Sequence, residues 1–143
     1  KTSSVTRRGY LNELKQLTKQ LNLKNKVTYV GKKTPLELKA LYQSADIFVY
    51  PSLYENFGQP LLEAAAHGLP LISTSVGIAR DIIIDGETGY KISGKPEEIK
   101  ERIESLRNRS LRLQMGRRIQ DEVKNRFDWG NIMDQYTNLY RSL

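Results

Sequence analysis

Short apolar, β-rich runs alternate with helix-like segments up to residue 92, and this alternation limits the fold more than any other feature of the sequence. Residues 46–50 (DIFVY) form an almost continuous apolar run, and residues 70–74 (PLIST) form a second buried-strand pattern. Such runs are typical of strands that are covered on both faces. A helix opened by Pro60 and closed by Gly68 is predicted between them. The sequence therefore predicts an α/β fold with a mainly parallel sheet and flanking helices.

Helical periodicity, turn residues and caps extend this prediction along the chain. Thr34 and Glu37 form a capping box around Pro35, which indicates that a helix starts at that proline. Asp85 and Gly86 indicate a turn before a short strand. In chain order, the predicted elements are a helix at 9–21, a strand at 26–30, a helix at 35–44, a strand at 46–50, a helix at 60–67, strands at 70–74 and 90–92, and helices at 96–107, 110–125 and 128–143.

The composition is that of one globular domain, because 38% of the 143 residues are hydrophobic and 27% are charged. The chain has no cysteine and one histidine, which excludes a disulfide framework and argues against a zinc cluster. No apolar run approaches the length of a membrane span, and a cytoplasmic protein is expected. The net charge of +7 is concentrated in residues 1–43, which carry ten basic residues against two acidic ones. This distribution favours either an anionic partner or lysines that keep the domain soluble.

The candidate site lies where the chain leaves the strand at 46–50. Ligands bind outside the carboxyl ends of the strands in open parallel sheets, so the loop at 52–59 is well placed. Gly58 allows the backbone to come close to a ligand, and the first N–H groups of the helix at Pro60 favour an anion. The junction between this loop and this helix is therefore a candidate phosphate seat.

A carboxylate stands on each side of that seat. Glu55 lies in the loop and Glu63 lies in the first turn of the helix, and both can accept hydrogen bonds from hydroxyl groups. A ligand with phosphates in the middle and hydroxyl-rich groups at both ends fits this pattern, and a nucleotide-sugar is such a ligand. The carboxylate pair of a glycoside hydrolase fits less well, because that pair flanks a sugar in an open cleft and needs no anion-binding helix between its members.

The same stretch resembles the donor-site segment of the family 4 (group 1) retaining glycosyltransferases, which have the GT-B fold. The family pattern is approximately P-S-x-x-E-G-F-G-x-P-x-x-E-A-x-A-x-G-x-P, and this chain has PSLYENFGQPLLEAAAHGLP at residues 51–70. Glu55 and Glu63 form the E-x7-E motif of that pattern. A second family segment, V-G-G-x-x-E-I-I-x-D-G-x-T-G, is matched by VGIARDIIIDGETG. The resemblance implies a Rossmann-like parallel sheet with flanking helices, as part of the C-terminal domain of a GT-B fold.

The resemblance also implies a role for each residue of the site. Glu63 is expected to bind the ribose hydroxyls of the nucleotide, and Glu55 is expected to contact the donor hexose and is the candidate catalytic residue. Backbone N–H groups near the glycine turn are expected to meet the sugar or the diphosphate. No cofactor and no metal are expected, since the chain has no Asp-x-Asp motif. The implied donor-binding residues are Tyr29, Gly31, Glu55, Asn56, Phe57, Gly58, Gln59 and Glu63.

Two departures from the family pattern fall inside the site. Asn56 stands where the family usually has glycine, and the turn is expected to survive because asparagine tolerates a positive φ. Arg80 and Asp81 stand where the family usually has proline and glutamate. Asp81 is expected to keep the acidic charge, and Arg80 adds a cation near the site, so donor specificity is open.

The resemblance implies a longer enzyme than residues 1–143. In the family, an arginine and a lysine that neutralise the diphosphate lie upstream, behind an acceptor domain. We therefore expect these residues to be a partial C-terminal donor-binding domain that is inactive alone. In the sheet of the whole domain, two strands that are absent here are expected to lie side by side between the strands at 26–30 and 46–50. The expected whole enzyme transfers a hexose from a nucleoside diphosphate sugar to a glycan or lipid-linked acceptor. Peripheral association with the inner face of the membrane is also expected, and a nucleic-acid partner is not.

Two other classes of function remain open from the sequence. One is a non-catalytic nucleotide-binding or interaction module that kept the fold. The other is a nucleic-acid or membrane-surface binder that uses the basic front end, although no nucleic-acid-binding motif is present.

Some residues of interest also have structural alternatives. Glu63 is alternatively a solvated carboxylate on the helix surface or a partner for Arg80, and Glu55 is alternatively a charge of the loop. His67 is predicted to pack or to interact with the helix end rather than to act as a base, and residues 88–89 are predicted to form a turn rather than a phosphate contact. Three late aromatic residues at helical spacing are expected in the core or in contact with the absent domain: Trp129, Tyr136 and Tyr140.

Overall fold

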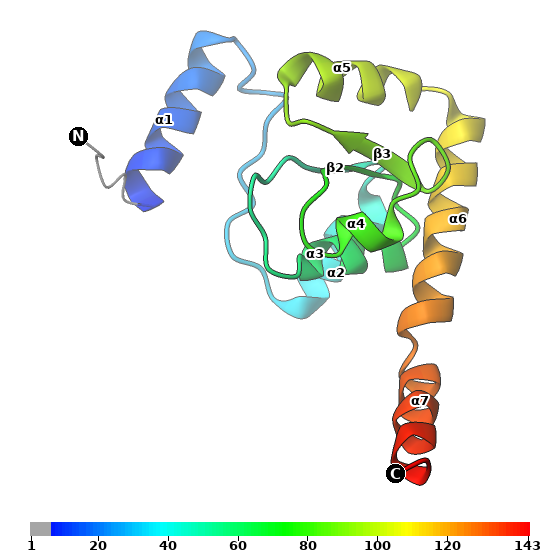
Figure 1. Cartoon of the computed structure of the whole chain (residues 1–143). Helices are drawn as coiled ribbons and strands as arrows, with labels where there is room; N and C mark the ends of the chain where they lie inside the picture. The colour runs from blue at the N-terminus through cyan, green and yellow to red at the C-terminus, as the bar shows by residue number, and fades with distance from the viewer. Residues whose placement is uncertain (1–6) are drawn as a thin grey trace. The chain divides into compact units, whose positions relative to one another are not determined.

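A computed structural model describes residues 7–143 (Figure 1). The chain divides into two units, Lys1–Pro35 and Leu36–Leu143, and each unit is treated by itself. Helix α1 (Arg7–Gln20) belongs to the first unit. It confirms the helix predicted at 9–21, with its start two residues earlier.

The strand predicted at 26–30 is wrong, because this segment has no strand structure. Its apolar side chains are partly exposed, with Val30 at 44%. A strand exists through its hydrogen bonds to a neighbour, and within residues 7–143 no strand pairs with this segment. Tyr29 instead places its hydroxyl 2.5 Å from Thr18 Oγ1 of α1. A β-rich composition favours a strand only where a partner is in place.

The second unit contains the sheet. Strands β1 (Phe48–Tyr50), β2 (Leu71–Thr74) and β3 (Gly89–Ile92) are parallel and lie in the order β1-β2-β3. In the register of the first pair, Val49 lies opposite Ile72. The predicted parallel pairing of the 46–50 and 70–74 runs is confirmed, and β3 extends the sheet in the same direction.

Helix α3 (Gln59–Ala66) connects β1 to β2, and both of its ends are set by local sequence. Pro60 lies in the first turn, and Gly58 is the N-cap with a φ of 84°. At the other end Gly68 has a φ of 73°, and its N–H donates to Ala65 O at 2.9 Å while Leu69 N–H donates to Ala64 O at 3.1 Å. These two bonds form a Schellman cap, so the predicted helix and its closing glycine are confirmed.

Four other helices were predicted in this unit, and all four are present. They are α2 (Pro35–Ser44), α5 (Pro96–Ser105), α6 (Arg109–Phe127) and α7 (Trp129–Arg141). A fifth, α4 (Ala79–Ile82), was not predicted. A single helical turn is too short to show a 3.6-residue period.

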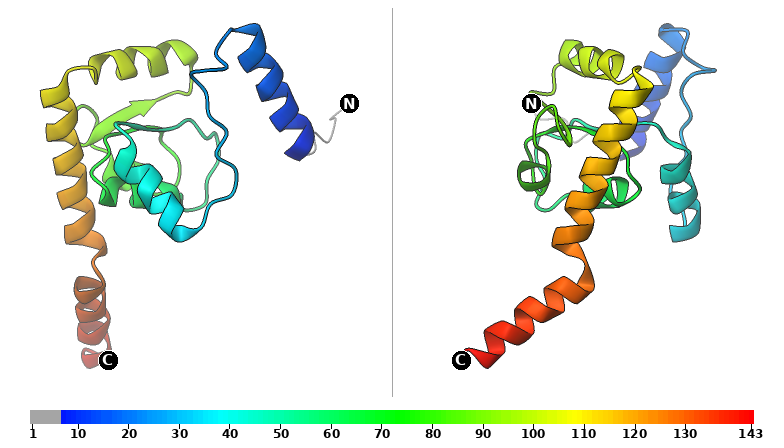
Figure 2. Two further views of the ribbon diagram at one scale, coloured as in Figure 1. Left: turned by 180° about the vertical axis from the view of Figure 1, so that it is seen from behind. Right: turned by 90° about the vertical axis from the view of Figure 1, so that its right-hand side faces the viewer.

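The core lies on both faces of the sheet, and alternate residues of β2 point to opposite sides. Leu71 packs in a cluster with Leu61 of α3 and Ile119 of α6. Ile72 packs in a second cluster with Met115 of α6. Helix α6 therefore contributes to both clusters, and Figure 2 shows it running past the sheet.

Helix α7 continues from α6 away from the sheet (Figure 2). Its aromatic residues are exposed, with Trp129 at 74%, Tyr136 at 55% and Tyr140 at 71%. Of the two predicted places for these aromatic residues, the core is therefore wrong, and contact with a further domain stays a prediction. Within residues 7–143, no helix combines the length and the hydropathy needed to cross a bilayer.

Candidate functional site

The loops that follow β1 and β2 leave the same edge of the sheet and bind each other. Ser73 Oγ at the end of β2 donates to Tyr50 O at 3.0 Å. Further out, Ile78 N–H donates to Phe57 O at 2.7 Å. Gly77 makes this approach possible, since its φ is 49° and a Cβ there would clash with the Phe57 backbone. The two sequence segments that carry the family resemblance are therefore joined in space.

These loops and α4 enclose a cleft of about 360 Å³, within the range of small-ligand sites. We call it the Glu55 cleft. It is lined by Glu55, Asn56, Phe57, Gly77, Ile78, Arg80 and Asp81.

Glu55 is half-buried at this cleft, and a residue of β1 binds its carboxylate. The hydroxyl of Tyr50, the last residue of β1, donates to Glu55 Oε2 at 2.8 Å. Burial, and then the hydrogen bond to Glu55, raise the pKa of Tyr50 above its usual value. The hydroxyl therefore stays protonated at neutral pH and can donate.

Glu63 is half-buried on α3 and has two side-chain partners. Its predicted place in the first turn is wrong, because α3 begins at Gln59 and Glu63 lies beyond that turn. The Tyr42 hydroxyl donates to Glu63 Oε2 at 3.0 Å, and Gln59 Nε2 donates to Oε1 at 3.0 Å. Burial, followed by the hydrogen bond to Glu63, raises the pKa of Tyr42 to about 12. The predicted alternative of a Glu63–Arg80 pair is wrong, because Arg80 Nε donates to Ser75 O at 2.9 Å instead.

Glu63 lines a different cleft from Glu55. This Glu63 cleft has a volume of about 510 Å³ and lies between α3 and the α6–α7 junction. Phe57 lines both clefts. Phe57 thus borders the clefts of both glutamates. The residues that line the Glu63 cleft are Phe57, Gln59, Leu62, Glu63, Ala66, Val123, Phe127, Trp129 and Ile132.

The start of α3 lies between the glutamates in sequence and has few N–H groups to offer. Pro60 has no N–H, and Leu61 N–H already donates to Gly58 O at 2.9 Å. The first N–H groups of a helix have no partner inside the helix. Those of Gly58 and Gln59 are therefore the donors that this helix start can present to an anion.

The reason predicted for the survival of the turn, a positive φ at Asn56, is wrong. Within residues 7–143, Asn22 is the non-glycine residue with a positive φ, so Asn56 is not left-handed. The left-handed position is taken by Gly58, two residues later. The Asn56 side chain accepts a hydrogen bond from the Tyr54 hydroxyl at 2.8 Å, and both residues are exposed in the loop.

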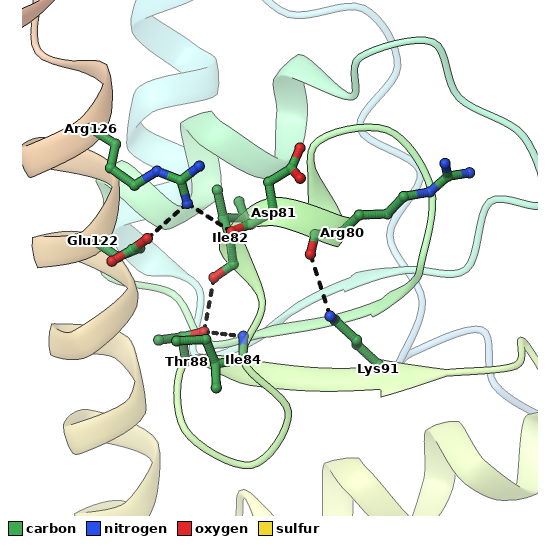
Figure 3. A network of polar contacts seen from close by, with 8 residues as sticks. All are labelled: Arg80, Asp81, Ile82, Ile84, Thr88, Lys91, Glu122 and Arg126. Carbon is green, nitrogen blue, oxygen red and sulfur yellow. Dashed lines mark hydrogen bonds and ion pairs between the residues drawn. The ribbon is translucent and has the colours of Figure 1, made fainter.

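Arg80 and Asp81 are both in the Glu55 cleft and project in different directions from α4 (Figure 3). Arg126 of α6 holds α4 in place, since its Nη1 donates to Asp81 O at 2.7 Å and pairs with Glu122 Oε1 at 2.8 Å. The cleft therefore carries charges of both signs. Arg80 is a cation at this site, as the sequence predicted.

Other candidate residues are structural or lie elsewhere. The Thr88 hydroxyl is buried and donates to Ile82 O at 2.9 Å, which agrees with the predicted turn role. His67 stacks on Tyr42 with ring centroids 5.3 Å apart, and its Nδ1 lies 2.7 Å from Glu63 O, so its predicted packing role is confirmed. Tyr29 and Gly31 belong to the first unit, whereas the rest of the candidate site is in the second.

Sequence reasoning missed the two tyrosines that donate hydrogen bonds to Glu55 and Glu63. Tyr50 had a weak signal, because it ends the strand that leads into the site. Tyr42 had none, because it lies 21 residues from Glu63 and on a different helix. Among the described residues, no group of three or more acidic, histidine or cysteine side chains is placed to hold a metal ion.

Comparisons with known proteins agree on one family. The family model for glycosyl transferases group 1 matches residues 8–122. The D-inositol 3-phosphate glycosyltransferase of Corynebacterium urealyticum is 30% identical over 132 residues, which is 91% of this chain but 31% of that protein. This chain thus spans less than a third of the length of that relative.

Two solved structures are similar to this chain. The C-terminal domain of a glycosyl transferase group 1 family protein (LpcC) from Francisella tularensis is 29% identical, with a TM-score of 0.80 over 90% of this chain and 66% of that one. Anabaena HepE in complex with UDP-glucose has a TM-score of 0.84 over 96% of this chain and 38% of that one, and at 24% identity it shows the fold alone. Such neighbours have the GT-B fold. The predicted α/β fold is confirmed, and by sequence and by fold this chain belongs to the group 1 glycosyltransferases.

Proposed function

We propose that this chain is the nucleotide-sugar-binding part of a retaining glycosyltransferase. The whole enzyme would transfer a hexose from a nucleoside diphosphate sugar to a glycan or lipid-linked acceptor. The observation that carries the proposal is a pair of hydrogen-bonded carboxylates in two clefts that share Phe57, one in the loop before α3 and one on α3 itself. The family assignment supplies the reaction class.

A nucleotide-sugar has three chemically different parts, and the site has a matching group for each. The Gly58 and Gln59 N–H groups suit the diphosphate, because a helix start favours an anion. Glu63 suits the ribose hydroxyls and Glu55 suits the hexose hydroxyls. The HepE fold neighbour holds UDP-glucose, so this fold can accommodate such a ligand.

In the proposed reaction, the oxygen of an acceptor hydroxyl forms a bond to the anomeric carbon while the bond from that carbon to the diphosphate breaks, and the hydroxyl proton passes to the departing diphosphate oxygen. The acceptor attacks from the face that the diphosphate leaves, so the anomeric configuration is retained. The chain's contribution is to orient the hexose through Glu55 and to stabilise the charge on the departing diphosphate at the α3 start. The metal-independent chemistry predicted from the sequence, and a location at the inner face of the membrane, remain part of this proposal.

Substitution of the two glutamates in the full-length protein tests the proposal. Calorimetry with UDP, GDP and ADP and with their glucose conjugates identifies the nucleotide. Glu63→Ala is expected to weaken binding of the free nucleotide by about ten- to a hundredfold, the value of a hydrogen bond to a charged group. Glu55→Gln is expected to lower turnover while leaving the affinity for the free nucleotide nearly unchanged, because that ligand has no hexose.

Glu87→Ala is the matched control, because Glu87 is an exposed glutamate in the turn before β3 and lines neither cleft. Equal loss of free-nucleotide affinity in both site variants would show that the glutamates form one nucleotide clamp. Binding without turnover of any sugar donor would favour the non-catalytic module. The anomeric configuration of the product, read by NMR, tests retention.

A further inference from the structure

A row of aromatic rings connects the two glutamates of the candidate site. His67 stacks on Tyr42 at 5.3 Å, Tyr42 lies 5.9 Å from Phe48, and Phe48 stacks on Tyr50 at 5.9 Å, all between ring centroids. Phe48 and Tyr50 are two residues apart on β1 and therefore share a face of the strand. The row is built from α2, β1 and the end of α3.

The two hydroxyls of this row reach the two carboxylates. The Tyr42 hydroxyl donates to Glu63 Oε2, and the Tyr50 hydroxyl donates to Glu55 Oε2, at 3.0 and 2.8 Å. Tyr42 is only 8% exposed, and a buried phenol needs a hydrogen-bond partner to offset its lost hydration. In both cases that partner is a glutamate of the proposed site.

We infer that Tyr42 and Tyr50 are positioning residues that fix the carboxylates of Glu63 and Glu55 for the nucleotide and for the sugar. This inference rests on the proposed function. Each phenol donates to the Oε2 atom of its glutamate, which leaves accepting capacity on Oε1 for the ligand. For Glu63, Oε1 also accepts from Gln59, and each carboxylate oxygen has two lone pairs, so a ribose hydroxyl can still bind there.

The ring row makes the two carboxylates parts of one rigid unit. Side-chain rotation of a half-buried glutamate would otherwise spread its carboxylate over several staggered conformers. A hydrogen bond from a ring that is packed against other rings restricts the carboxylate to one of them. A pre-organised acceptor then costs less conformational entropy when the ligand binds.

Phenylalanine variants in the full-length protein test this inference, since they keep the rings and remove only the hydroxyls. Tyr42→Phe is expected to weaken binding of the free nucleoside diphosphate by about two- to tenfold. Tyr50→Phe is expected to leave that affinity unchanged and to lower kcat with the nucleotide-sugar by a similar factor. The probe is whichever of UDP, GDP and ADP the wild-type protein binds in calorimetry.

Tyr90→Phe is the matched control. Tyr90 is also 8% exposed, but it packs in the cluster on the other face of the sheet, with Arg102 over its ring. No change in nucleotide affinity or kcat is expected for this variant. Circular dichroism establishes that each variant is folded, and Tyr50, which is less buried, supplies a second and independent test.

A double-mutant cycle separates positioning from a general loss of structure. In a Glu63→Ala background, Tyr42→Phe is expected to have no further effect on nucleotide affinity, because its partner carboxylate is gone. An equal loss in both backgrounds would overturn the inference. So would an unchanged affinity in Tyr42→Phe beside a weakened Glu63→Ala, and that result would leave the proposed function intact. If Glu63→Ala itself binds normally, the proposed function fails, and the inference fails with it.

Discussion

Tyr42 belongs both to the core, through its ring, and to the candidate site, through its hydroxyl. Its ring packs in the same buried cluster as Leu61 and Leu71, while its hydroxyl donates to Glu63. Burial and this hydrogen bond raise the pKa of Tyr42 to about 12, because both disfavour the phenolate. A raised pKa in the folded state means that the folded chain favours the neutral phenol over the phenolate more strongly than the unfolded chain does.

The raised pKa predicts how stability depends on alkaline pH. The contribution of Tyr42 is fully present below about pH 10, its usual pKa, and is lost as the pH rises toward about 12. The difference between those values corresponds to at most about 2.7 kcal/mol. The free energy of unfolding of the wild type, minus that of Tyr42→Phe, is therefore expected to be constant from pH 7 to pH 10 and to fall above it. Urea denaturation at each pH measures this difference, and a difference that rises above pH 10 would contradict the prediction.

At the scale of elements, the contact between α3 and α6 depends on a helical glycine. A Cβ at Gly116 of α6 would clash with Gly68 O, in the cap that closes α3. Four residues later, Gln120 Nε2 donates to Ala66 O at 2.7 Å. Helix α6 therefore lies directly on the end of α3, and this contact fixes the helix that carries Glu63.

Gly116→Ala is expected to destabilise the protein by about 1–3 kcal/mol through overpacking. Helix propensity alone predicts the opposite sign, since alanine is favoured over glycine by about 1 kcal/mol inside a helix. Urea denaturation measures the change in the free energy of unfolding. Gln114→Ala, at an exposed position of the same helix, is the control and is expected to be nearly neutral. A stabilised Gly116→Ala variant would show that α6 does not lie this close to the α3 cap.

At the scale of the whole molecule, α7 presents an apolar face to solvent. Its exposed side chains include Trp129, Met133, Tyr136, Leu139 and Tyr140. Contiguous exposed apolar surface of this kind is typical of contact sites between proteins or domains. The sequence-based expectation that α7 contacts a further domain stays a prediction.

Trp129 allows this prediction to be measured, because it is the single tryptophan of the chain and is 74% exposed. Residues 1–143 alone are expected to give solvent-exposed tryptophan emission and iodide quenching close to that of the urea-unfolded chain. In a longer protein whose other domain covers α7, the emission is expected to shift to shorter wavelength and the quenching to fall. Blue-shifted, protected emission from residues 1–143 alone would contradict the exposed position of α7.

The sequence by itself determined the features that depend on a few neighbouring residues. The opening of α3 by Pro60 in its first turn and its closure at Gly68 were predicted, because caps and turn glycines act locally. Strands β1 and β2 were predicted from their apolar runs, and their parallel direction followed from the helix that connects them. The position of Glu55 at the carboxyl edge of the sheet followed from the same pattern.

Only the tertiary structure decided which side chains meet across the chain. The strand expected at 26–30 did not form, since propensity cannot supply a neighbouring strand. Trp129 is exposed, although its helical spacing made the core one of its two predicted places, because a buried face also needs an element to cover it. The bond from Tyr42 to Glu63 joins residues 21 positions apart on different helices. Such a contact depends on how α2 and α3 pack on the sheet, and no local sequence pattern encodes that packing.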